Sequence, residues 1–207
     1  MNLMKKKDTL IINLIGGPGS GKSTTAAGLF YKLKQMGIDC EMALEFAKDK
    51  VWEESLMTLN DQIYIFGKQY HKLWRLNNKV DVIITDSPLL VSLYYNKEES
   101  KYFNDFVVEQ YNKFNNVLYF INRPDDYQTN GRTQTEEESK NIDKVLKNLI
   151  TNYNISYKEI DCYKAVEEIV KDNEEIETVY AHLKIDTGLC RYGTIFSKTE
   201  EIKSIFK

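Results

Sequence analysis

The residues with the most recognisable chemistry lie in the stretch GGPGSGKST, residues 16–24. A glycine, four residues, a second glycine, a lysine and a serine follow one another in the order of the phosphate-binding loop signature. Glycines let the backbone turn tightly, the lysine contacts the outer phosphates, and the serine hydroxyl ligates magnesium. The stretch therefore predicts a site for ATP and Mg²⁺, with Lys22 also catalytic. The predicted nucleotide-binding residues are Gly16, Gly17, Gly19, Ser20, Gly21, Lys22, Ser23 and Thr24.

Two carboxylates stand where strands are predicted to end. Asp86 follows the apolar run VIIT, and Glu45 follows the predicted strand 39–44, which we expect beside the first strand. In an open parallel sheet, ligands bind beyond the carboxyl ends of the strands. There Asp86 would act with Ser23 as a metal residue, and Glu45 would orient or deprotonate an acceptor hydroxyl. A turn or cap role for Asp86 and a surface role for Glu45 are the alternatives.

Two of the chain's four arginines flank a polar segment with turn signals, after the fourth predicted strand. We expect residues 122–136 to form a lid in which Arg123 and Arg132 stabilise charge on the transferred phosphoryl group. An exposed loop with solvated arginines is the alternative.

A long amphipathic stretch carries candidates for recognition of the acceptor. Apolar residues at spacings of three and four predict one helix over 52–73. Gln62 and Gln69 are seven residues apart and share a face of that helix, and an amide can read the edge of a nucleobase. Trp52 or Tyr64 could stack on an aromatic ring. Solvated amides and a core tryptophan are the alternatives.

Strands and helices alternate along the chain. This order predicts an α/β fold with three layers, in which a five-stranded parallel sheet has helices on both faces. We expect one domain over 1–207, with its core at about 8–173 and a C-terminal extension at 174–207. The predicted strands are 10–15, 39–44, 80–85, 117–121 and 155–160. The predicted helices are 24–36, 52–73, 102–114, one that begins after a capping box at Thr135 and Glu138, and one from about 163.

Composition limits the partners. The 207 residues carry a net charge of −3, which disfavours nucleic acid, and no apolar run reaches membrane-spanning length. The three cysteines are far apart in the sequence and predict reduced thiols in the cytoplasm. The expected partner is a small-molecule nucleoside or nucleotide acceptor, with no membrane; a homodimer is left open.

The chain resembles the P-loop kinases of nucleosides and nucleotides, and it is most similar to the nicotinamide riboside kinase-like ATPases of bacteria and phages. The resemblance covers residues 10–160 and rests on GGPGSGKST, EFAKDKVWE, LNDQIYIFGKQ, VIITDSPLL and YFINRPDDYQTNGRTQTEEE. It implies that Glu45 is the base for an acceptor hydroxyl, that Asp86 is associated with the metal, and that Arg123 and Arg132 belong to a lid.

One departure from that pattern affects the choice of acceptor. In deoxynucleoside and thymidylate kinases an arginine follows the acidic residue after the third strand, whereas Ser87 and Pro88 follow Asp86 here. A ligand for an acceptor phosphate is therefore missing, which favours transfer of the γ-phosphate of Mg-ATP to a nucleoside-like hydroxyl. A nucleoside monophosphate kinase, a non-catalytic ATP-binding regulator and a kinase of polynucleotide ends are alternatives.

Overall fold

The computed structural model describes residues 8–96, 100–124 and 135–173. Arg132, most of the predicted lid and the C-terminal extension at 174–207 lie outside these residues. Within the described ranges, no helix combines the length and the apolar character needed to cross a membrane.

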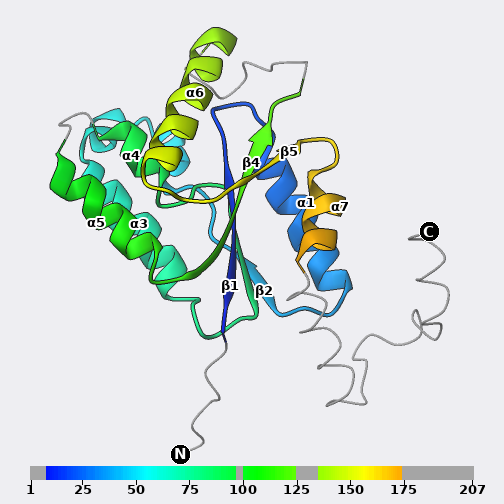
Figure 1. The fold of residues 1–207 in the computed structure, drawn as a ribbon. Helices are drawn as coiled ribbons and strands as arrows, with labels where there is room; N and C mark the ends of the chain where they lie inside the picture. Colours follow the sequence, from blue (N-terminus) through cyan, green and yellow to red (C-terminus); the bar gives the residue numbers. More distant parts are fainter. Residues whose placement is uncertain (1–7, 97–99, 125–134, 174–207) are drawn as a thin grey trace, which may run out of the picture.

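A parallel sheet forms the centre of the molecule (Figure 1). Its five strands lie in the order β2-β3-β1-β4-β5, and every neighbouring pair is parallel. The predicted fold class is confirmed. The expected position of β2 beside β1 is wrong, because β3 lies between them. The strands are β1 (Leu10–Ile15), β2 (Cys40–Met42), β3 (Val82–Thr85), β4 (Asn115–Asn122) and β5 (Lys158–Asp161).

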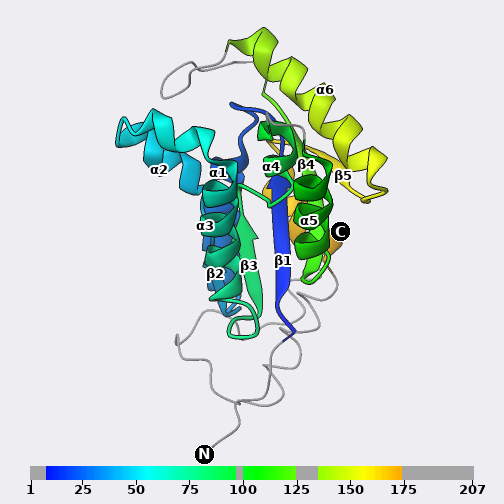
Figure 2. The same ribbon diagram turned by 90° about the vertical axis from the view of Figure 1, so that its left-hand side faces the viewer.

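Helices cover both faces of this sheet. Figure 1 shows α1 and α7 on one face and α3, α4, α5 and α6 on the other, and Figure 2 shows α2 and α6 extending beyond the carboxyl ends of the strands. The helices are α1 (Lys22–Gln35), α2 (Phe46–Trp52), the 3₁₀ helix η1 (Leu56–Asn60), α3 (Gln62–Trp74), α4 (Val91–Tyr95), α5 (Lys101–Tyr111), α6 (Glu136–Asn152) and α7 (Ala165–Asp172).

The central strand explains why two cores form. All six residues of β1 are buried, and successive side chains point to opposite faces. Ile11 and Ile15 therefore pack with α3, α5 and α6, whereas Ile12 and Leu14 pack with α1 and α7. A strand without a polar face suits a parallel sheet that is covered on both sides.

The prediction of one helix over 52–73 is wrong. The stretch is divided into α2, η1 and α3, and Glu54 has a left-handed backbone with φ of 55° that ends the first helical segment. Asp61 then starts α3, because its side chain accepts a hydrogen bond from the N–H of Tyr64 at 3.0 Å. The apolar residues keep their spacing of three and four across the breaks between α2 and η1 and between η1 and α3, so this pattern did not reveal the breaks.

Other local predictions agree with the structure in part. The capping box of Thr135 and Glu138 is present at the start of α6. The second, third and fifth strands are shorter than predicted, and α4 was not predicted.

Candidate functional site

The phosphate loop connects β1 to the first residue of α1. Gly21 has φ of 90°, a left-handed conformation that an L side chain rarely adopts, and α1 begins at the next residue, Lys22. The N-terminal end of α1 therefore adjoins the loop, where its free N–H groups and dipole favour an anion. This strand–loop–helix arrangement is the context that the sequence motif requires.

Lys22 folds back on this loop. Its ammonium donates hydrogen bonds to the carbonyl oxygens of Gly16 at 2.7 Å and Gly17 at 2.9 Å. Burial lowers the pKa of Lys22, and the carboxylates of Glu45 and Asp86 oppose that shift. These three of the predicted catalytic groups are therefore close enough to influence one another's charge.

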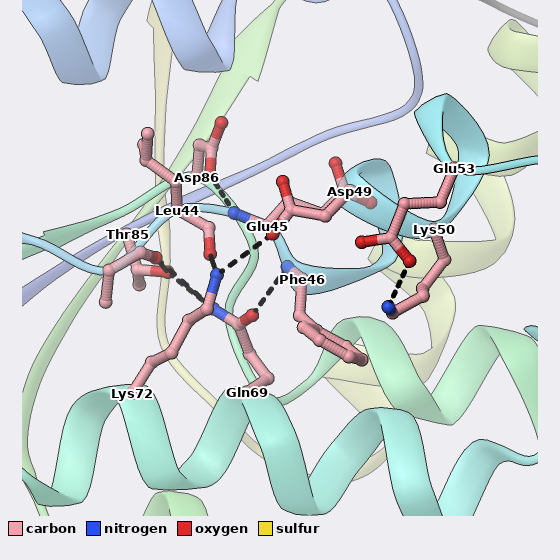
Figure 3. A network of polar contacts seen from close by, with 11 residues as sticks. Leu44, Glu45, Phe46, Asp49, Lys50, Glu53, Gln69, Lys72, Thr85 and Asp86 are labelled. Atoms are coloured by element: carbon pink, nitrogen blue, oxygen red, sulfur yellow. Dashed lines mark hydrogen bonds and ion pairs between the residues drawn. The ribbon is translucent and has the colours of Figure 1, made fainter. Parts of the chain in front are cut away.

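Asp86 joins the loop to the segment that carries Glu45. One carboxylate oxygen accepts a hydrogen bond from the hydroxyl of Ser23 at 2.6 Å, and the other accepts one from the backbone N–H of Glu45 at 3.0 Å. Figure 3 shows the hydrogen bond between the Asp86 carboxylate and the Glu45 backbone. The Asp86 residue is only 3% exposed, so its position is set by these contacts.

Ser23 and Asp86 have the chemistry of a magnesium site. A hydroxyl and a carboxylate oxygen 2.6 Å apart are hard oxygen donors, which Mg²⁺ prefers. No group of three or more histidine, cysteine or acidic side chains suited to a metal occurs in the described part of the chain. Few protein ligands are typical of Mg²⁺ bound with a nucleotide, because phosphates and water complete its coordination.

Glu45 lies at the start of α2 and is partly buried. Burial raises the pKa of its carboxyl group, Lys22 lowers it, and Asp86 raises it. Tyr95 of α4 was missed by the sequence reasoning: burial and the nearby Glu45 carboxylate raise its pKa to about 12. Since α4 was not predicted, no sequence signal placed this tyrosine near the site.

Arg123 lies against the phosphate loop. Its guanidinium donates to the carbonyl oxygen of Pro18 at 2.9 Å and to Asp143 of α6 at 2.5 Å. The other oxygen of Asp143 accepts from the N–H of Gly17 at 2.5 Å. A Cβ atom on Gly17 would lie 2.6 Å from the carbonyl oxygen of Ser139, so this close approach of α6 requires glycine. Asp143 was missed by the sequence reasoning.

The predicted acceptor residues lie in different settings. Gln69 is 5% exposed, and its amide is hydrogen-bonded to the backbone of Ala43 and Phe46. Gln62 donates to the carbonyl oxygen of Leu59 at 2.7 Å. Trp52 is 71% exposed at the end of α2, so it is no core residue.

A shallow cavity of about 470 Å³ lies between α2, η1 and α3. Tyr64 contributes to its lining and meets the ring of Phe46 edge-on, with 5.7 Å between the ring centres. Phe46 directly follows Glu45, so an aromatic pair adjoins the candidate base. The lining residues are Lys50, Met57, Thr58, Asp61 and Tyr64.

Solved structures support the fold. A NadR protein in complex with NR has 15% identity, a TM-score of 0.54, and coverage of 91% of this chain and 54% of its own. A NadR protein in complex with NAD and AMP-PNP has 13% identity and a TM-score of 0.51, and the match covers 91% of this chain and 52% of that protein. This chain thus spans about half the length of those proteins. Shikimate kinase from Aquifex aeolicus is also similar, with 19% identity and a TM-score of 0.45, and the match covers 83% of this chain and 98% of that enzyme.

Sequence comparison gives the family. No curated protein matches the chain. Residues 11–168, which include the phosphate loop, Glu45, Asp86 and Arg123, match the model of a family described as an AAA domain. The match covers more than half of the chain, and the fold and the phosphate loop agree with it. This protein therefore belongs to that AAA-domain family.

Proposed function

We propose that this protein is a magnesium-dependent kinase that transfers the γ-phosphoryl group of ATP to a hydroxyl of a nucleoside-like acceptor. One observation carries the proposal: the Asp86 carboxylate contacts both the Ser23 hydroxyl and the backbone of Glu45. Asp86, a carboxylate suited to Mg²⁺, therefore lies next to Ser23 of the phosphate loop and to the residue that carries the candidate base, Glu45. A protein that only binds ATP needs no base at that position.

The nucleotide side of the site uses charge and backbone donors. Lys22 would exchange its bonds to Gly16 and Gly17 for the outer phosphates, because an ammonium binds phosphate oxygens more strongly than neutral carbonyls. Ser23 and Asp86 would hold Mg²⁺, which neutralises phosphate charge when it is bound. Arg123 contacts the loop at Pro18, where its guanidinium adds positive charge.

The acceptor side of the site uses Glu45. As the acceptor oxygen forms its bond to phosphorus, the hydroxyl proton passes to the Glu45 carboxylate and the bond from phosphorus to ADP breaks. A carboxylate with a raised pKa is a stronger base than an ordinary one, and burial raises the pKa of Glu45. The aromatic pair of Phe46 and Tyr64 offers a surface for a planar base.

The hydroxyl acceptor is favoured over a phosphate acceptor by the sequence after β3. Ser87 and Pro88 follow Asp86, so no arginine is available there for a second phosphate. The NadR protein that was solved with NR has a similar fold, and a small-molecule ligand of that kind is consistent with the proposed acceptor.

A phosphoryl-transfer screen tests the proposal. The protein is incubated with radiolabelled ATP and Mg²⁺ together with nucleosides, nicotinamide riboside, nucleoside monophosphates or oligonucleotides. We expect label on a nucleoside-type acceptor, and none without magnesium. Tight ATP binding with no labelled acceptor would instead indicate a regulator, and label only on monophosphates would indicate a nucleoside monophosphate kinase.

A further inference from the structure

The segment that contains Glu45 is held by side chains from two neighbouring elements. We define the Glu45 segment as residues 43–46, which run from the end of β2 to the first residue of α2 (Figure 3). On its α3 side, the Gln69 Oε1 atom accepts a hydrogen bond from the N–H of Phe46 at 3.1 Å. The Gln69 Nε2 atom donates to the carbonyl oxygen of Ala43 at 3.2 Å. One amide therefore bonds to the backbone before and after Glu45.

Other side chains complete this arrangement. Thr85 at the end of β3 donates its hydroxyl hydrogen to the Ala43 carbonyl oxygen at 2.7 Å. Lys72, one turn after Gln69 on α3, donates to the carbonyl oxygen of Leu44 at 2.9 Å. The N–H of Glu45 donates to Asp86. Each residue of the Glu45 segment therefore has a backbone group bonded to a side chain from α3 or from residues 85 and 86.

Gln69 is suited to this task for a chemical reason. An amide offers a donor and an acceptor together, and both are needed to bond an N–H and a carbonyl oxygen of the same segment. Gln69 is also buried on α3, so replacing it with an apolar residue would leave the Phe46 N–H without this partner. Such a fully bonded polar group fixes a loop in one conformation.

We propose that Gln69 is a positioning residue that fixes the backbone on both sides of Glu45 and so directs its carboxylate toward Lys22 and the bound acceptor. The part that concerns catalysis rests on the proposed function. The mechanical part, by which we mean that Gln69 fixes the backbone of the Glu45 segment, does not depend on the proposed function.

Amide hydrogen exchange, followed by NMR, tests the mechanical part. Gln69→Met keeps the length of the side chain but removes its hydrogen bonds to Phe46, Ala43 and Thr85. We expect the Phe46 amide to exchange roughly tenfold to hundredfold faster than in the wild type. Gln110→Met is the matched control: Gln110 is 8% exposed, lies on α5 and bonds to Glu109 and Lys113. Unchanged exchange at Phe46 in Gln69→Met would overturn the proposal.

A double-mutant cycle tests whether Gln69 acts through Glu45. We expect Gln69→Met to lower kcat roughly tenfold to hundredfold while the Kd for Mg-ATP stays within about twofold. In the Glu45→Gln background the same substitution should lower kcat by less than about twofold. An equal loss in both backgrounds would show that Gln69 acts independently of Glu45. If the wild type phosphorylates no acceptor, the proposed function fails, and the exchange rates still decide the mechanical part.

A second variant guards against a folding defect. Gln69→Glu has the same shape, and its carboxyl group, when protonated, has both an oxygen that can accept from the Phe46 N–H and a hydroxyl that can donate to the Ala43 carbonyl oxygen. We expect slow exchange at Phe46 to be retained in this variant, even where Gln69→Met is too unstable to study. Fast exchange at Phe46 in a folded Gln69→Glu protein would contradict the role assigned to the acceptor oxygen.

Discussion

The contact between Asp143 and the phosphate loop allows a quantitative prediction. The carboxylate of Asp143 accepts from Arg123 and from the Gly17 N–H, and its side chain is 19% exposed. Asp143→Asn retains one acceptor oxygen but removes the charge that pairs with Arg123. A hydrogen bond to a charged group contributes about 1.5–3 kcal/mol, and the retained oxygen and solvent access reduce this, so we expect a loss of about 1–2 kcal/mol. For a chain of this length the Tm should fall by roughly 2–8 °C.

The control for this prediction comes from the same helix. Glu136 of α6 forms an exposed ion pair with Lys140 at 2.7 Å, and such pairs contribute little to stability. Thermal unfolding of Asp143→Asn, Glu136→Gln and the wild type, followed by circular dichroism, compares the two carboxylates. Equal Tm values for all three proteins would refute the reasoning, because the partly buried contact would then be no stronger than the exposed one.

Three further variants test the predicted roles at the site. Lys22→Ala should abolish phosphoryl transfer without lowering the Tm; normal ATP turnover would contradict the role of the phosphate loop. Asp86→Asn should require more Mg²⁺ for half-maximal transfer while ATP binding changes less; identical magnesium titrations would count against a metal role. Glu45→Gln should reduce transfer by about 10²–10⁴-fold with ATP affinity within a few-fold. Because burial raises the folded-state pKa of Glu45, the contribution of this group to stability falls as pH rises above its ordinary pKa of 4.5. In pH-dependent urea unfolding, Glu45→Gln should therefore lose less stability over that range than the wild type.

Local signals in the sequence predicted the nucleotide side of the fold well. The first strand was predicted at 10–15 and is observed as β1 (Leu10–Ile15). A continuous apolar run that ends at a glycine-rich loop has few alternative structures, because strand, loop and helix are specified within a short stretch. The capping box of α6 is equally local, since Thr135 and Glu138 bond to each other's backbone groups.

Contacts between distant residues were beyond sequence reasoning. Asp143 is one of several acidic residues on a charged helix, and its partner Gly17 is 126 residues away. Gln69 carried an ambiguous signal, because a glutamine on an amphipathic helix can face a ligand, solvent or a buried backbone. In the structure Gln69 faces the backbone of the Glu45 segment, where its amide is hydrogen-bonded to Ala43 and Phe46.

The order of the strands explains how the candidate site is assembled. If β2 lay beside β1, the segment after β2 would adjoin the phosphate loop with no residue between them. Instead β3 lies between these strands, and it pairs with β1 at Ile83 and Ile11 and with β2 at Ile84 and Met42. The residue that follows β3 therefore has the loop on one side and the Glu45 segment on the other. Asp86 occupies that position, which is why one carboxylate can contact both Ser23 and Glu45.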